Sequence, residues 1–213
     1  MIQSNLKLTL PKLYPITDTR ISGLTHLEQV RRMIAGGASL IQLRDKTASS
    51  GAFFRAASEA VDFAHAHDTK IIINDRVDLA LAVGADGVHL GQDDLSPVQA
   101  RKLLGDQKII GFSTHSVEQV LASLKFPIDY VAIGPVFTTS TKADPDPVLG
   151  LSGVQAALRA VGDLPLVAIG GIGRTNAISV LESGVDCVAM ISDLVSDPEE
   201  ISDRVRKFLD ALR

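Results

Sequence analysis

Short apolar runs, many of them β-branched, recur along the chain and alternate with longer amphipathic stretches. The runs lack strict alternation of polar and apolar positions, which is typical of strands covered on both faces. The segments that we expect to be strands are 12–18, 39–45, 70–75, 87–91, 108–115, 130–136, 165–172 and 187–192. The pattern therefore predicts buried strands of the kind found in parallel sheets.

The stretches between these runs carry helix signals. Residues 49–66 have apolar side chains at helical spacing. Thr25 followed by Glu28 is a capping box pattern, and Ser116 followed by Gln119 is a second helix start. Helices therefore separate the predicted strands.

Strand and helix alternate eight times along the chain. Such alternation implies parallel pairing through right-handed crossovers, and eight units can close into an α/β (β/α)₈ TIM barrel. No linker, low-complexity tract or charge block divides the chain, so we expect a single domain, 1–213. An open doubly wound sheet is the alternative fold.

Composition narrows the class of protein. The chain has 213 residues, 46% of them hydrophobic, and a net charge of −4, which argues against disorder and against a nucleic-acid partner. Cys187 is the only cysteine, lies in an apolar run and is expected to be a buried thiol. No signal-peptide pattern and no apolar stretch of membrane-spanning length occur, so we expect a cytoplasmic protein without a membrane partner.

Polar residues and glycines gather where the predicted strands end, and the strand starts have no comparable set. Barrel enzymes build their sites at the carboxyl ends of the strands, so this asymmetry indicates an enzyme. The residues at these ends are Thr17, Asp18, Gln42, Arg44, Asp45, Lys46, Asn74, Asp75, His89, Gly91, Gln92, Asp93, Asp94, Ser113, Thr114, His115, Thr138, Thr139, Thr141, Lys142, Gly170, Gly171, Ser192 and Asp193.

Two cations lie at the carboxyl end of the second predicted strand. Gln42 and Arg44 share one face of the strand by period two, and Lys46 follows on the loop. A guanidinium can grip phosphate oxygens bidentately, so the group suits a pyrophosphate. The alternative is a salt bridge from Arg44 to a neighbouring carboxylate.

Two carboxylates end adjacent predicted strands. Asp75 follows the third strand and Asp94 follows the fourth. Mg²⁺ prefers one or two carboxylates together with water and phosphate oxygens, so the pair could share this cation. Helix N-capping is the alternative for each of them, and Asp93 is the better candidate for a cap than Asp94.

A threonine-rich loop and a glycine pair follow the sixth and seventh predicted strands. Thr139, Thr141 and Lys142 could bind a phosphate, and the glycine N–H groups after the seventh strand could cradle one where a helix begins, with Ser192 as partner. The alternatives are an ordinary surface loop and a tight turn.

The histidines carry weaker signals. His89 and His115 lie near the mouth, where a structural role and a functional one are equally compatible with the sequence. His65 and His67 are expected to be exposed or to cap a helix end, and His26 is expected to be exposed.

The chain resembles the thiamine-phosphate synthases over residues 12–195. The segments that carry the resemblance are, in order, QLRDK, INDRVDLALAVGADGVHLGQDD, GFSTH, GPVFTTSTKAD, AIGGI and MIS. That family has a barrel fold and, with Mg²⁺, joins hydroxymethylpyrimidine pyrophosphate to thiazole phosphate, which gives thiamine phosphate and pyrophosphate. The resemblance therefore implies a Mg-dependent transferase with two small-molecule substrates.

The resemblance also implies a role for each matching position. The pyrimidine would be contacted by Gln42, His89 and Gly91. The pyrophosphate would be held by Arg44, Lys46, Asn74, Ser113 and Lys142, and the catalytic residues among these would be Arg44, Lys46, Ser113 and Lys142. Magnesium would be bound by Asp75 and Asp94. The thiazole phosphate would lie against Thr139, Thr141, Gly171, Ile191 and Ser192. The chain departs from the family pattern at Asp45, where glutamate is commoner, and at Ala189, where serine is frequent.

The resemblance further implies a dissociative reaction, in which pyrophosphate leaves before the thiazole nitrogen attacks. Two other functions fit the same barrel. One is the related thiazole tautomerase, which could use His115 as acid and base. The other is a non-catalytic sensor of a phosphorylated ligand. Homo-oligomerisation is left open.

Overall fold

A closed barrel of parallel strands forms the centre of the molecule. The computed structural model describes residues 8–139, 141 and 146–212, and within them eight strands pair in chain order, with β1 also paired to β8. The strands are β1 (Leu13–Asp18), β2 (Leu40–Arg44), β3 (Lys70–Asn74), β4 (Gly87–Leu90), β5 (Ile109–Thr114), β6 (Tyr130–Ile133), β7 (Leu166–Ile169) and β8 (Cys187–Met190). The predicted barrel is confirmed, and the open sheet is excluded because both edges of the sheet are paired.

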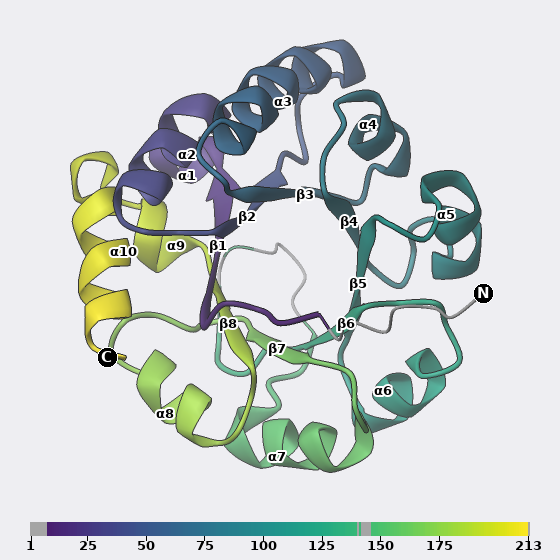
Figure 1. The fold of residues 1–213 in the computed structure, drawn as a ribbon. Coiled ribbons are helices and arrows are strands. Elements are labelled where there is room, and N and C mark those ends of the chain that lie inside the picture. The colour runs from purple at the N-terminus through teal and green to yellow at the C-terminus, as the bar shows by residue number, and fades with distance from the viewer. Residues whose placement is uncertain (1–7, 140, 142–145, 213) are drawn as a thin grey trace.

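The helices form an outer ring around the strands, as the view along the barrel shows (Figure 1). They are α1 (Thr19–Ser22), α2 (His26–Ala35), α3 (Ser50–His65), α4 (Val77–Ala82), α5 (Pro97–Leu104), α6 (Val117–Ser123), α7 (Gly150–Ala160), α8 (Ala177–Glu182), α9 (Ser192–Val195), the 3₁₀ helix η1 (Pro198–Glu200) and α10 (Ile201–Asp210). The predicted capping box of Thr25 and Glu28 is present, and Ser116 caps α6 as expected. The predicted extent of the domain, 1–213, includes residues outside the described ones and stays a prediction.

Side chains alternate between the barrel interior and the helix layer. Along β2, Ile41 and Leu43 belong to the large core cluster beneath the helices, whereas Leu40 belongs to a second cluster inside the barrel. The interior cluster consists of Leu10, Tyr14, Ile16, Leu40, Ile72, Tyr130, Ala132, Val167, Cys187 and Ala189. Because both faces of the strands are covered, the strands are mostly apolar without strict alternation, which explains the sequence pattern.

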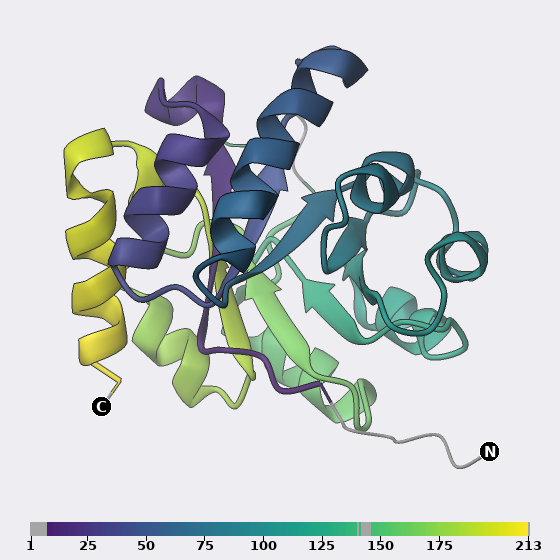
Figure 2. The ribbon, with the colours of Figure 1, turned by 45° about the horizontal axis from the view of Figure 1, so that its top comes forward.

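The amino-terminal end of the barrel is covered by the chain that precedes β1. This segment crosses the opening of the ring in Figure 1 and lies below the strands in Figure 2, and Leu10 is buried among the interior side chains. The interior is therefore packed at this end, and the cavity described below opens at the other.

Two of the sequence expectations concern single side chains. Cys187 is fully buried inside the barrel, as predicted. His26 was expected to be exposed, and this prediction is wrong, because only 2% of it is accessible. Its Nδ1 atom lies 2.8 Å from Thr17 Oγ1, and its ring packs on Phe53, so the first turn of α2 turns this residue inward.

No helix among the described residues is both long enough and apolar enough to cross a membrane.

Candidate active site

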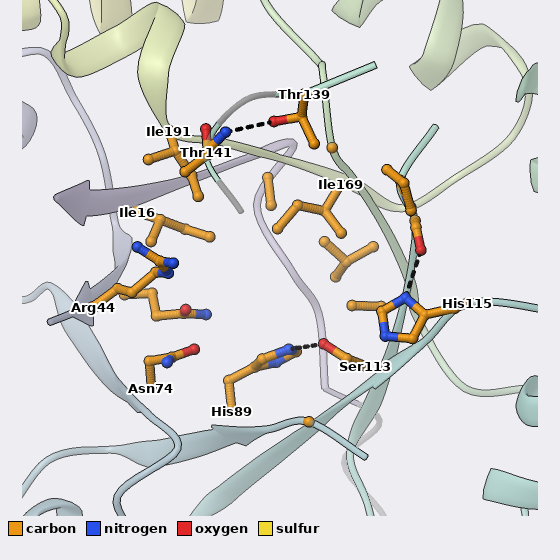
Figure 3. Close-up of a pocket in the computed structure, with 18 of the residues that line it drawn as sticks. Ile16, Arg44, Asn74, His89, Ser113, His115, Thr139, Thr141, Ile169 and Ile191 are labelled. Atoms are coloured by element: carbon orange, nitrogen blue, oxygen red, sulfur yellow. Dashed lines mark hydrogen bonds between the residues drawn. The ribbon is translucent and has the colours of Figure 1, made fainter. Parts of the chain in front are cut away.

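A cavity of about 490 Å³ opens at the carboxyl ends of the strands. Residues from most of the strand ends face it, and Figure 3 shows their side chains converging on one space. The predicted site residues among them are Gln42, Arg44, Lys46, Asn74, Asp75, His89, Gly91, Asp94, Ser113, Thr139, Thr141, Gly171, Ile191 and Ser192. The structure therefore brings together every predicted site residue except Lys142, which lies outside the described residues.

The cations on the β2 side of the cavity are each paired with a carboxylate. Arg44 Nη1 lies 2.6 Å from Asp18 Oδ2, and Asp18 also caps α1. Lys46 Nζ contacts Asp75 Oδ2. The salt bridge expected as the alternative role of Arg44 is thus present, and Arg44 still lines the cavity, so the two readings are compatible. Asp18 fixes one end of the guanidinium while further donors face the cavity.

Asp75 and Asp94 meet at the rim between β3 and β4. Burial raises the pKa of the Asp94 carboxyl, and the neighbouring Asp75 raises it further. Asp94 Oδ2 also accepts a hydrogen bond of 2.7 Å from the Gly91 N–H. Neither aspartate caps a helix: Arg76 precedes α4 without a side-chain cap, and Ser96 caps α5. The capping alternative is therefore wrong for both.

The prediction that Asp93 is a helix cap is also wrong. Ser96 accepts the hydrogen bond from the Gln99 N–H at the start of α5, with Pro97 in the first helical turn. A serine followed by proline satisfies this helix start, so Asp93 stays an exposed residue of the rim.

The two carboxylates fit a divalent cation. No group of three or more acidic, histidine or cysteine side chains suited to a metal occurs in the described part of the chain. Asp75 and Asp94 thus stand as a pair, and two carboxylates with places left for water and phosphate oxygens match the preference of Mg²⁺. Asp75 has a φ of 64°, which is a costly backbone conformation for aspartate.

Asn74 supplies an amide at the same wall. Its Nδ2 atom is buried, and it has no hydrogen-bond partner among the residues that the structure describes. Buried polar groups are normally paired, because an unpaired donor costs about 1–3 kcal/mol. Since Asn74 lines the cavity, an anionic ligand there would satisfy this donor.

A chain of hydrogen bonds crosses the floor of the cavity. Gln42 Nε2 donates to the Tyr14 hydroxyl at 3.1 Å, and the Tyr14 and Tyr130 hydroxyls lie 3.2 Å apart. Tyr130 reaches His89 Nδ1 at 2.9 Å, and His89 Nε2 lies 2.8 Å from Ser113 Oγ. Burial lowers the pKa of His89 to about 4, so its ring is neutral at pH 7.

Tyr14 and Tyr130 also line the cavity, although neither was a predicted site residue. Both lie near the starts of their strands rather than at the carboxyl ends, and tyrosine is common in strands. The available signal was their position in the strand: Tyr14 lies two residues before Ile16 on β1, and Tyr130 two residues before Ala132 on β6, so each pair shares the interior face. A Cβ atom at Gly111 would overlap the Tyr130 ring, so this glycine makes room for it.

The opposite wall combines hydroxyls with exposed backbone. Thr139 and Thr141 border the cavity next to Ile191 (Figure 3), and Thr141 N donates to Thr139 Oγ1 at 3.3 Å. Gly171 has a φ of 63°, and any Cβ there would clash with Thr138 O and Phe137. The β7 loop therefore packs closely on the β6 loop and presents its backbone to the cavity.

The helix predicted to begin at the glycines after β7 starts later. α8 begins at Ala177, and Gly173 N donates to the Asn176 side chain instead. The short α9, which begins at Ser192 and which the sequence analysis did not predict, follows β8 directly. The backbone of the β7 and β8 loops thus meets where many barrels bind a phosphate.

Apolar side chains line the depth of the cavity between these walls. Ile16, Val167, Ile169 and Ala189 face the space, and they offer a surface for a flat ring. The residue pattern therefore suits a ligand with an apolar ring at one end and phosphates at the rim.

His115 lies across the cavity from Arg44 (Figure 3). Its Nδ1 atom lies 2.7 Å from Gly134 O and 3.4 Å from Asp146 Oδ2. Because a carbonyl oxygen only accepts hydrogen bonds, Nδ1 donates to Gly134 O, and this backbone contact holds the ring in place.

Comparison with known proteins points to one family. The family model described as thiamine monophosphate synthase matches residues 13–194. The thiamine-phosphate synthase of Koribacter versatilis is 43% identical over 212 residues, which cover 96% of this chain and 97% of that protein. The thiamine-phosphate synthase of Methanospirillum hungatei is 43% identical over 202 residues, with 94% and 97% covered.

A solved structure agrees with these relatives. The thiamine phosphate pyrophosphorylase of Pyrococcus furiosus superposes with a TM-score of 0.83 at 36% identity, and the match covers 94% of this chain and 96% of that one. Sequence and fold therefore agree along nearly the whole chain.

Proposed function

The chain belongs to the thiamine monophosphate synthase family, and on this premise we propose that it joins hydroxymethylpyrimidine pyrophosphate to thiazole phosphate with the aid of Mg²⁺. The products are thiamine phosphate and pyrophosphate. The observation that carries the proposal is the meeting of Asp75 and Asp94 at a rim that also holds Arg44, Lys46 and Asn74. This rim offers both the ligands of a cation and the donors for a diphosphate.

The pyrophosphate would lie along the β2–β5 side of the cavity. Arg44, Lys46, Asn74 and Ser113 would donate to its oxygens, together with Lys142. Asp75 and Asp94 would hold Mg²⁺, which supplies positive charge to the leaving group when bound. Lys46 already contacts Asp75, so cation, ammonium and diphosphate would share one network.

The two rings would meet in the apolar part of the cavity. We assign the pyrimidine to Gln42, His89 and Gly91, and the thiazole phosphate to Thr139, Thr141, Gly171, Ile191 and Ser192. The walls between them, Ile16 and Ile169 included, would exclude water and align the rings.

Bond formation needs no strong base from the protein. The bond between the pyrimidine methylene carbon and the bridging oxygen breaks, and its electron pair leaves with the pyrophosphate. The aminopyrimidine stabilises the resulting cation, and the lone pair of the thiazole nitrogen then forms the new C–N bond. Negative charge develops on the leaving pyrophosphate in this step, and Arg44 and Lys46 would stabilise it.

The test is an assay for pyrophosphate release with each substrate alone and with both, in the presence and absence of Mg²⁺. We expect release only when both substrates and Mg²⁺ are present. Isomerisation of a single thiazole without the pyrimidine would instead identify a tautomerase that uses His115. Binding of a phosphorylated ligand without turnover would identify a sensor, and either result would overturn the proposal.

The cytoplasmic location stays a prediction.

A further inference from the structure

The hydrogen-bonded chain on the cavity floor links residues of five different strands. Gln42, Tyr14, Tyr130, His89 and Ser113 come from β2, β1, β6, β4 and β5. Tyr14 and Tyr130 are buried and lie below the rim, so they do not reach an anion bound there. Their position suggests that they act through the residues at the two ends of the chain.

The direction of the chain follows from counting donors. The Gln42 amide nitrogen can only donate, so the Tyr14 oxygen accepts from it. The Tyr14 hydrogen then has one acceptor among the described residues, the Tyr130 oxygen, and Tyr130 passes its own hydrogen to His89 Nδ1. With Nδ1 as acceptor, the neutral ring carries its proton on Nε2 and donates to Ser113 Oγ.

We propose that Tyr14 and Tyr130 are positioning residues that hold His89 with its proton on Nε2, so that Ser113 directs its hydroxyl hydrogen at an anion in the cavity. This inference rests on the proposed function, since that anion is the pyrophosphate. Ser113 accepts from His89, so its one hydrogen is free to point to the ligand.

The opposite direction would serve the reaction poorly. If the Gln42 amide were turned over, its oxygen would accept from Tyr14 and the chain would run backwards to a proton on His89 Nδ1. Ser113 would then give its hydrogen to His89 and turn only lone pairs towards the anion. The two directions therefore differ in whether Ser113 attracts or repels the leaving group.

The tautomer of His89 decides between the two directions without any substitution. In ¹⁵N-histidine spectra of the unmodified protein without substrates, we expect a single tautomer with the proton on Nε2, assigned through correlations to the backbone. A proton on Nδ1 overturns the inference. Because no turnover is involved, this result is independent of the proposed function.

Substitution of Tyr130 by phenylalanine tests the consequence for the reaction. Tyr130→Phe removes the hydrogen bond to Nδ1, so we expect mixed His89 tautomers and a kcat about tenfold lower, with the KM for thiazole phosphate changed less than about twofold. In a Ser113→Ala background the same change should cost less than about twofold, because the group that it positions is gone.

Thr114→Val is the matched control. Thr114 is a buried neighbour of Ser113 whose hydroxyl donates to Ala132 O at 2.9 Å, outside the chain on the floor. Thr114→Val should lower the stability of the fold about as much as Tyr130→Phe does, without changing kcat or the His89 tautomer. An unchanged kcat in Tyr130→Phe, or an equal loss in the Ser113→Ala background, overturns the inference. A lack of pyrophosphate release by the unmodified protein overturns the proposed function instead.

Discussion

At the scale of single residues, the rim of the cavity combines features that are unfavourable for stability, namely a strained backbone and two neighbouring carboxylates. Asp75 sits in a left-handed backbone conformation, and its carboxylate lies against Asp94, whose pKa is raised by burial and by this neighbour. Lys46 offsets part of the negative charge. Strain and like charges concentrated at one rim indicate that binding, rather than stability, accounts for these residues.

The substitution Asp94→Asn should separate binding from stability. Without ligands we expect a higher melting temperature at pH 7, because the cost of burying the charge and the repulsion from Asp75 are both removed. With Mg²⁺ and pyrophosphate, the unmodified protein should gain stability and the variant should gain little, and synthase activity should be lost. Differential scanning fluorimetry with and without the ligands measures both effects.

The pH dependence has a definite sign. A raised carboxyl pKa means that charged Asp94 destabilises the folded state above that pKa, and the penalty disappears as the pH falls towards the ordinary value of 3.8. The advantage of Asp94→Asn should therefore shrink in acid. Asp93→Asn, an exposed neighbour, is the control and should change neither property. If Asp94→Asn were still stabilised by Mg²⁺ and pyrophosphate, the assignment of Asp94 as a metal ligand would be contradicted.

At the scale of elements, each strand-to-helix connection both supports the barrel and carries site chemistry. Asp18 is the last residue of β1 and caps α1. The same carboxylate pairs with Arg44 of β2, which lines the cavity. The starts of α2, α3, α5 and α6 are instead capped by hydroxyl side chains that do not line the cavity, namely Thr25, Ser49, Ser96 and Ser116. The two kinds of helix start should therefore respond differently to substitution.

The capping box of α2 tests this difference. Thr25→Ala removes the acceptor for the Glu28 N–H, and we expect a loss of about 1 kcal/mol in the free energy of unfolding with kcat unchanged. Urea denaturation and the synthase assay measure the two quantities. Thr25→Ser keeps the oxygen and should retain most of the stability. A fall in kcat for Thr25→Ala at saturating substrate would show that α2 influences the site.

At the scale of the whole molecule, closure of the barrel buries a cluster of side chains below the open cavity. The segment before β1 covers one end of the barrel, and the site residues occupy the other. Cys187 lies fully buried between them, and burial raises the pKa of its thiol above the ordinary value. A protonated, buried thiol is unreactive.

Thiol labelling should therefore report unfolding of the barrel. We expect Cys187 to react with a disulfide reagent on the order of a thousandfold more slowly in the native protein than in urea, because access requires global opening. Mg²⁺ with pyrophosphate should slow the reaction further, since bound ligands stabilise the native state. Rapid labelling of the native protein would show that the barrel opens locally near β8.

The sequence by itself determined the order and type of the main elements and the set of residues at the mouth. Apolar runs without alternation marked the strands, because both faces of each strand are buried. Polar side chains at the carboxyl ends of the strands identified Gln42, Arg44, Asp75 and Asp94 as site residues, because parallel strands in a barrel bring these ends to one rim. These conclusions need only local patterns and one topological rule.

Only the tertiary structure decided which partners these residues have. The pairing of Arg44 with Asp18 and the floor chain through Tyr14 and Tyr130 join atoms far apart in the sequence. The burial of His26 depends on how α2 packs against its neighbours. Side-chain partners follow from the three-dimensional register of the strands, and a one-dimensional pattern of polarity does not contain that register.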